Sequence, residues 1–156
     1  MPVPAITFYS VVVFLHVAAV VVAFGVLFAY PVLLDAARRG AVADLAWFHR
    51  ALGLVARRVI TPAGAVVLLA GLYLALDGPY DFGDPWIGTS LLILVVVLGM
   101  TGAYFTPRHR RLAELAAGGE AGPAYDATFR QVQRGVLLAD ALIVVALFLM
   151  VTKPGG

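Results

Sequence analysis

Long apolar runs separated by short charged segments dominate this chain. The first run, Ile6 to Leu34, contains no Asp, Glu, Lys or Arg, and three more apolar runs follow it. A helix needs about 20 residues to cross the hydrocarbon core of a bilayer. Backbone groups in lipid must be hydrogen-bonded within their own helix or in a closed barrel. The pattern therefore predicts an all-α, polytopic four-helix membrane bundle with spans at about 7–34, 51–76, 86–105 and 135–152.

The composition supports a membrane protein. Hydrophobic residues make up 62% of the 156 residues and charged residues only 13%, whereas soluble domains carry about 25% charged residues. This length suits a single transmembrane domain over residues 1–156. The first run is longer than a signal-peptide core of about 7–15 residues, so we expect it to be retained as a span. The absence of cysteine excludes thiolate metal sites, and a net charge of +2 gives no indication of nucleic-acid binding.

Arginines gather in two of the three connecting segments. Residues 35–58 contain five, residues 106–134 contain five more, and residues 77–85 contain three aspartates but no Lys or Arg. The positive-inside rule then predicts an N-out/C-out topology with a short outer loop and two Arg-rich cytoplasmic loops. Such loops also favour contact with anionic lipid headgroups. In the third loop, we expect Pro107 to begin a short helix that ends at Ala117.

Small residues recur at helical spacing in every predicted span. Helices in a bilayer associate through close packing and not through hydrophobicity, so small residues mark the faces where they approach one another. We therefore predict a tight bundle whose contacts form at the following pairs: Gly25 and Ala29, Gly64 and Gly71, Gly99 and Ala103, and Gly135 and Ala139.

His16 is the first candidate for chemistry. It is the only side chain in the first span that readily ionises near neutral pH, and such a group needs a partner, a ligand or local water. One interpretation makes it an axial ligand of haem b, a copper ligand or a proton-relay group. The other makes it a neutral histidine that is hydrogen-bonded to a neighbouring helix.

Asp140 is the second candidate, as the only charged residue of the fourth span. A charge near the middle of a span is unfavourable by about 2.5–3.5 kcal/mol on insertion scales. We expect a structural ion pair between Asp140 and either Arg57 or Arg58 to offset that penalty. A protonated carboxyl that takes part in proton transfer is the alternative.

The other two histidines, His49 and His109, lie in the Arg-rich segments. We expect both on the surface, facing water or lipid headgroups, with a ligand role as the alternative. The sequence has no phosphate-binding loop, no paired-histidine helix motif and no nucleophile triad. It therefore predicts no catalytic residues and leaves open whether the protein is an enzyme.

Short motifs spread over nearly the whole chain carry a resemblance to a known family: Phe14-Leu15-His16-Val17 with Gly25 and Tyr30-Pro31, Gly71-Leu72 followed by Phe82-Gly83-Asp84-Pro85-Trp86, and Phe148-Leu149-Met150-Val151-Thr152-Lys153-Pro154. They resemble a bacterial family of four-helix integral membrane proteins of unknown function. That family is similar, more distantly, to the membrane domain of copper-resistance protein D and to the membrane protoporphyrinogen oxidase that is thought to bind haem b. The resemblance implies a bacterial inner-membrane location and a haem b or copper ligand at His16.

Two departures weigh against transferring the oxidase activity. The tryptophan that those oxidases carry between the histidine and the glycine is absent, with Ala23 and Phe24 in that region, and Val32 replaces the basic residue after Pro31. The favoured hypothesis is therefore a small membrane protein of unknown activity, acting as an accessory or binding module with His16 as its cofactor or metal ligand. The alternatives are an oxidoreductase acting on a tetrapyrrole or quinone, and an oligomeric transporter or channel subunit for a metal ion or small solute, with Asp140 as the coupling group.

Overall fold

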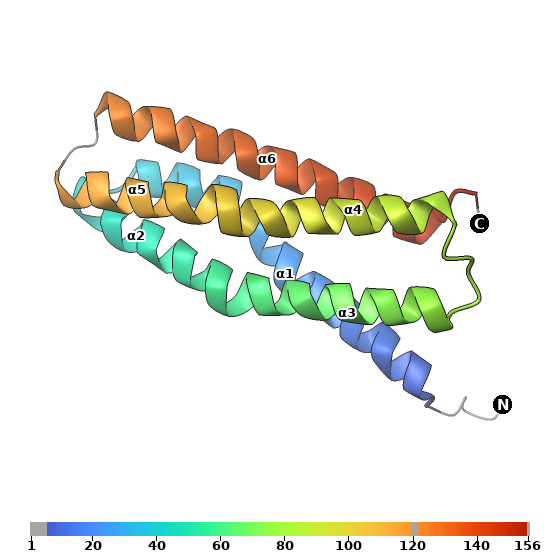
Figure 1. Cartoon of the computed structure of the whole chain (residues 1–156). Helices are drawn as coiled ribbons and strands as arrows, with labels where there is room; N and C mark the ends of the chain where they lie inside the picture. The colour runs from blue at the N-terminus through green and yellow to red at the C-terminus, as the bar shows by residue number, and fades with distance from the viewer. Residues whose placement is uncertain (1–5, 120–121, 156) are drawn as a thin grey trace.

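The computed structural model describes residues 6–119 and 122–155, which form helices and short connections and contain no strand (Figure 1). The α-helices are α1 (Phe8–Arg38), α2 (Val42–Val55), α3 (Thr61–Asp77), α4 (Pro85–Gly99), α5 (Thr106–Ala117) and α6 (Pro123–Thr152). Two π-helical turns, η1 (Ala56–Ile60) and η2 (Met100–Phe105), join α2 to α3 and α4 to α5 without a break. The predicted all-α class is thus confirmed.

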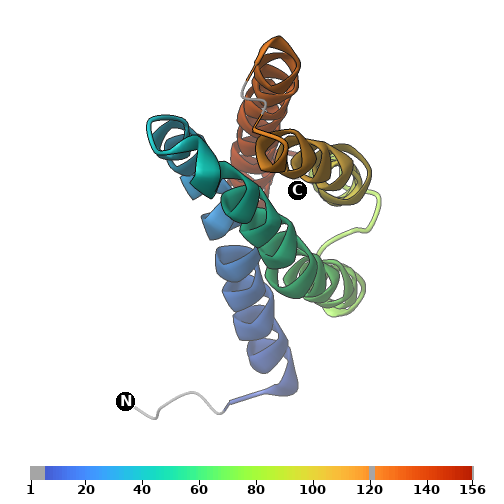
Figure 2. The ribbon, with the colours of Figure 1, turned by 90° about the vertical axis from the view of Figure 1, so that its left-hand side faces the viewer.

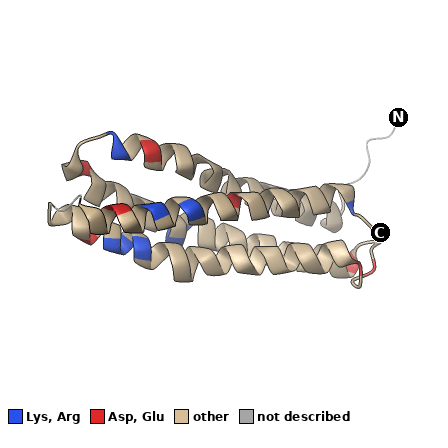
Figure 3. Ribbon diagram, turned by 90° about the horizontal axis from the view of Figure 1, so that it is seen from above, with Lys and Arg blue, Asp and Glu red and all other residues tan. Residues whose placement is uncertain are grey.

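Four continuous helical segments are long and apolar enough to cross a membrane: Phe8–Arg38, Val42–Asp77, Pro85–Ala117 and Pro123–Thr152. They run side by side as a bundle (Figure 1). The termini and the α3–α4 loop lie at one end, which we call the terminal end. The α1–α2 and α5–α6 connections lie at the other, which we call the arginine-rich end because most basic residues gather toward it (Figure 3). The predicted polytopic four-helix bundle is confirmed.

Two threonine–proline pairs explain why the second and third segments continue unbroken. A proline inside a helix lacks an N–H and crowds the preceding turn. The wider π turn takes up this strain, and the hydroxyl of the preceding threonine donates to the same carbonyl that accepts the threonine's backbone N–H. Thr61 Oγ1 lies 2.9 Å from the Ala56 oxygen, and Thr106 Oγ1 lies 2.9 Å from the Thr101 oxygen. The predicted helix from Pro107 to Ala117 is present as α5, and it continues α4 through η2.

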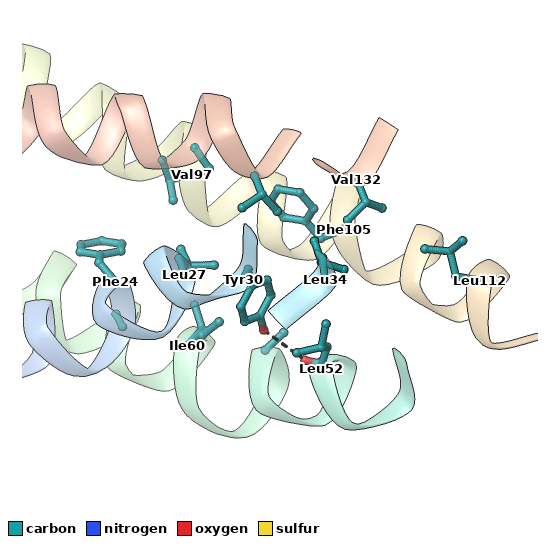
Figure 4. Close-up of a cluster of buried hydrophobic side chains, with 14 of the residues drawn as sticks. Phe24, Leu27, Tyr30, Leu34, Leu52, Ile60, Val97, Phe105, Leu112 and Val132 are labelled. Carbon is teal, nitrogen blue, oxygen red and sulfur yellow. Dashed lines mark hydrogen bonds between the residues drawn. The ribbon is translucent and has the colours of Figure 1, made fainter. Parts of the chain in front are cut away.

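The hydrophobic core fills the middle of the bundle and the arginine-rich end (Figure 4). Leu27, Tyr30 and Leu34 on α1 are almost fully buried, and the Tyr30 hydroxyl donates to the Leu52 carbonyl at 3.4 Å. Large core residues from the other three segments include Ile60, Val97, Phe105, Leu112, Phe129 and Val132. This half of the bundle is closed by side chains of all four segments.

At the terminal end, α1 diverges from α6. Its carboxyl-terminal half lies beside α6, whereas its amino-terminal half lies well away from it (Figures 1 and 2). On α1, Phe14, Leu15 and Val17 are exposed, as expected for side chains that face lipid. The divergence leaves space between the helices at this end.

Close approach of helices occurs at some of the predicted small residues. A Cβ atom at Gly64 would lie 2.3 Å from Leu98 Cδ2, and one at Gly135 would lie 2.6 Å from Tyr104 Cε1 and 3.0 Å from Phe105 Cε1. No heavy atom lies within 4 Å of the corresponding positions at Gly25 and Gly99. The small-residue prediction is therefore correct for spans two and four and wrong for the glycines of spans one and three.

We expect Gly135→Ala to lower the free energy of unfolding by about 1–3 kcal/mol, because the added methyl overpacks against aromatic rings that cannot withdraw easily. Phe105 is buried, and the Tyr104 hydroxyl is fixed on the Gln131 carbonyl at 3.0 Å. Gly25→Ala is the matched control, since its methyl enters open space and removes a flexible glycine from α1. It should be neutral or stabilising by up to about 1 kcal/mol. Unfolding in mixed micelles, followed by circular dichroism, measures both, and equal stabilities would contradict the packing described.

Candidate functional site

A cavity of about 640 Å³ lies between the helices at the terminal end. Ligand pockets typically measure about 300–1,000 Å³ and have mostly apolar walls with a few polar groups. Val, Leu, Ile, Ala and Phe side chains form most of this wall, and α1, α3, α4 and α6 all contribute. The polar or sulfur-bearing residues of the lining are Tyr9, His16, Tyr80, Trp86, Ser90, Met150 and Lys153. The cavity has the size and the composition of a small-molecule site.

His16, on α1, is one of the residues that line this cavity. Its Nδ1 lies 3.1 Å from the Val67 carbonyl oxygen. A carbonyl can only accept, so Nδ1 carries the hydrogen, and Nε2 of the neutral ring keeps a lone pair. A Cβ atom at Gly71 would lie 2.9 Å from His16 Cε1, so glycine at this position makes room for the ring. A histidine whose second nitrogen donates to a backbone carbonyl is the usual form of a metal ligand.

The same hydrogen bond also satisfies the alternative prediction of a neutral histidine bonded to a neighbouring helix. A metal ligand differs from such a structural histidine because its Nε2 is free and lies beside a cavity. His16 is half-buried and lies among apolar neighbours, where an unused lone pair is unfavourable. The position therefore favours a bound group without identifying it.

A second polar cluster lies at the arginine-rich end and consists of His49 on α2, His109 on α5 and Tyr125 on α6. The two Nδ1 atoms are 3.1 Å apart, and His49 Nε2 lies 2.8 Å from the Tyr125 hydroxyl. The three residues are only 1%, 3% and 1% exposed. The prediction that both histidines lie on the surface is therefore wrong. It failed because α2 and α5 extend beyond the predicted spans and pack against each other.

A sequence signal for this burial exists. His49 is spaced at helical intervals from Leu45 and Leu52, and His109 from Leu112 and Ala113, and all of these residues are buried. Apolar residues three or four positions away on the same helix mark a histidine on an inward face. The neighbouring arginines hide this pattern, because they lie on the opposite, exposed faces of the same helices.

The cluster joins three helices through directional bonds. Only one of two facing Nδ1 atoms can carry a hydrogen, so the pair holds a single proton between the rings. His109 Nε2 is buried and has no hydrogen-bond partner. In the described residues, no group of three or more His, Cys, Asp or Glu side chains is gathered in a way that could hold a metal. The cluster therefore ties α2, α5 and α6 together at the arginine-rich end.

Asp140 does not form the predicted ion pair with Arg57 or Arg58. The ion pairs of the described residues are Arg38–Asp126, Arg39–Asp35 and Arg110–Glu114, and Asp140 Oδ1 is buried without a hydrogen-bond partner. The reason is geometric, because Arg57 and Arg58 are exposed on η1 and point away from the bundle interior. Asp140 also does not line the cavity that contains His16.

We expect Tyr125→Phe to lower the free energy of unfolding by about 1–3 kcal/mol, because it leaves His49 Nε2 buried without a partner. Tyr73→Phe is the matched control. It removes an exposed hydrogen bond of 2.7 Å to Asp77 on the same helix, and its effect should stay within about 0.5 kcal/mol. Denaturant titration of the two variants in detergent makes the comparison. Similar losses in both would show that the buried cluster is not a stabilising unit.

The chain matches one family model, described as "Predicted integral membrane protein (DUF2269)", over residues 10–154. No curated protein matches the chain, and no solved structure does. The matched region includes the cavity residues from Val13 to Lys153 and the whole of the His49–His109–Tyr125 cluster. The family description names no ligand and no reaction. The protein is a multi-pass integral membrane protein that belongs to the DUF2269 family.

Proposed function

We propose that this protein is a binding or accessory module of the bacterial inner membrane and that it binds haem b through His16. The observation that carries the proposal is the state of the imidazole. Nδ1 is held by the Val67 carbonyl, Nε2 has no hydrogen-bond partner among the described residues, and the residue lines a cavity of about 640 Å³. A rigidly held imidazole with one free nitrogen beside an apolar cavity is the environment in which proteins bind haem iron.

The other lining residues suit a tetrapyrrole. The cavity walls are largely aliphatic, as an extended apolar macrocycle requires. Met150 on α6 lines the same cavity, and methionine is a common partner of histidine at haem iron. His16 and Met150 are thus the two side chains that would hold the iron. Haem b bound there would supply one-electron redox chemistry.

A copper ion is the second candidate, since imidazole and thioether ligands both suit Cu(I). His16 is the only imidazole in the cavity lining, and the cavity is much larger than a bare ion needs. These two observations favour an organic cofactor. An oxidoreductase acting on a tetrapyrrole or quinone would use the same cavity. Asp140, the coupling group of the transport hypothesis, lies outside it.

The proposed orientation places the terminal end, and hence the cavity, on the outer side of the membrane. It places the arginines on the cytoplasmic side, where anionic lipids attract them. A hollow of about 330 Å³ lined by Pro31, Arg130, Gln133, Arg134 and Leu137 combines two cations with apolar side chains. We propose that an anionic phospholipid headgroup contacts this hollow. Association into a homo-oligomer or a larger membrane complex belongs to the same proposal.

Protein purified in mild detergent from haem-replete cells should show a Soret band, and His16→Ala should abolish most of it, because the proposed iron ligand is lost. Val13→Ala is the control, since Val13 lies one turn earlier on α1 and lines the same cavity. It should keep the band. Size-exclusion profile and far-ultraviolet circular dichroism verify that each variant is folded.

A wild-type protein without a Soret band, or a band that His16→Ala leaves unchanged, would contradict the haem proposal. Stoichiometric copper in metal analysis, lost in His16→Ala and without a Soret band, would favour the copper alternative.

A further inference from the structure

Two residues of the cavity lining carry hydrogen-bond donors that no described residue satisfies. Trp86 Nε1 and Ser90 Oγ are both buried and have no partner. The two side chains are 9% and 2% exposed and line the cavity from successive turns of α4. Both donor atoms are covered by neighbouring atoms. Since buried polar groups in proteins are nearly always hydrogen-bonded, this part of the lining is stabilised by a ligand that accepts from them once the side chains turn toward it.

A positive charge completes this part of the cavity. Lys153 is the only lining residue that is Lys, Arg, Asp or Glu. Its ammonium group hydrogen-bonds the Tyr80 hydroxyl and lies 4.3 Å from the centroid of the Tyr80 ring. No carboxylate of residues 6–119 or 122–155 lies within 4.0 Å of it. The lining therefore offers one cation and several donors but no anion.

The backbone holds Lys153 in an unusual conformation. It is the C-cap residue of α6, with a φ of 46°, and its N–H donates to the Leu149 carbonyl at 2.8 Å. This left-handed position is unfavourable for a residue with a Cβ atom and usually carries glycine or asparagine. Strain of this kind tends to persist at functional sites. In this protein, the strained residue is a lysine whose side chain contacts Tyr80.

Tyr80 connects the charge to the α4 donors. Its ring meets the Trp86 ring edge to face, with centroids 5.3 Å apart. Lys153, Tyr80 and Trp86 thus form one contiguous cluster, and Ser90 lies one turn further along α4. These residues come from the end of α6, the α3–α4 loop and the beginning of α4, which all lie at the terminal end of the bundle (Figure 1).

From this arrangement we propose that the ligand of the cavity is an amphipathic carboxylate. Its carboxylate binds Lys153 and accepts from Trp86 and Ser90, and its apolar body extends along the aliphatic wall toward His16. The inference deepens the proposed function and rests on it, since it concerns the same cavity. It assigns a binding role to polar residues of that cavity other than His16. Tetrapyrroles that carry carboxylates, including haem b, belong to this ligand class.

The test separates the carboxylate from the metal. Full-length protein in detergent is titrated with metal-free protoporphyrin IX and with its dimethyl ester, and binding is followed by porphyrin fluorescence. Neither probe can form a bond from a metal to His16. We expect the acid to bind at least tenfold more tightly than the ester, which corresponds to about 1.4 kcal/mol.

The variants assign this preference to residues. Lys153→Asn should abolish the preference for the acid while leaving the affinity for the ester unchanged. Asparagine is chosen because it tolerates the left-handed backbone. Lys153→Arg should retain the preference. Trp86→Phe and Ser90→Ala should each reduce it. Arg50→Gln is the distant control, because Arg50 is exposed and lies outside the cavity lining.

Equal affinity of wild-type protein for acid and ester, or an undiminished preference in Lys153→Asn, would overturn the proposal. So would displacement of the acid by phosphatidylglycerol but not by phosphatidylcholine, which would assign the site to a lipid phosphate. The outcome is distinguishable from that of the haem experiment. An acid preference without a Soret band sustains the carboxylate site alone, and a His16-dependent Soret band without the preference sustains haem binding alone.

Discussion

A membrane interior offers no hydrogen-bond partner, so every polar group inside this bundle must be satisfied by the protein or by something bound to it. Most groups are. The hydroxyls of Thr61 and Thr106 donate to carbonyls at the two π turns, and His16 donates to the Val67 carbonyl. The unsatisfied groups are therefore the informative ones. Two of them, Trp86 Nε1 and Ser90 Oγ, belong to residues that line the same cavity as His16.

The bundle divides into a closed half and an open half. Toward the arginine-rich end, all four segments contribute to one core, and the His49–His109–Tyr125 cluster joins α2, α5 and α6 there. Toward the terminal end, α1 diverges from α6 (Figure 2), and residues of α1, α3, α4 and α6 line the cavity there. A rigid half that anchors the helices allows the other half to keep a preformed space, which a binding protein requires.

The histidines illustrate how position decides chemistry. His49 and His109 use their facing nitrogens on each other, and His49 uses its second nitrogen on Tyr125, so this pair is largely closed to a ligand. His16 uses one nitrogen on a carbonyl and presents the other to a cavity. The proposed site therefore combines the imidazole of His16 on α1 with a cationic, donor-rich cluster around Lys153. Together, these two parts of the cavity suit a large amphipathic ligand.

The sequence by itself determined the class of fold and the residue at the centre of the proposed site. Charge-free runs specify transmembrane helices because hydropathy and length are local properties, and His16 is conspicuous in such a run for the same reason. Only the tertiary structure decided which distant residues meet. The π turns carry α2 and α5 past the expected boundaries and bury His49 against His109, and Arg57 and Arg58 point away from Asp140. Lys153, Tyr80 and Trp86 come together from three separate segments. Contacts of this kind depend on how helices cross and where they end, which no local pattern of residues encodes.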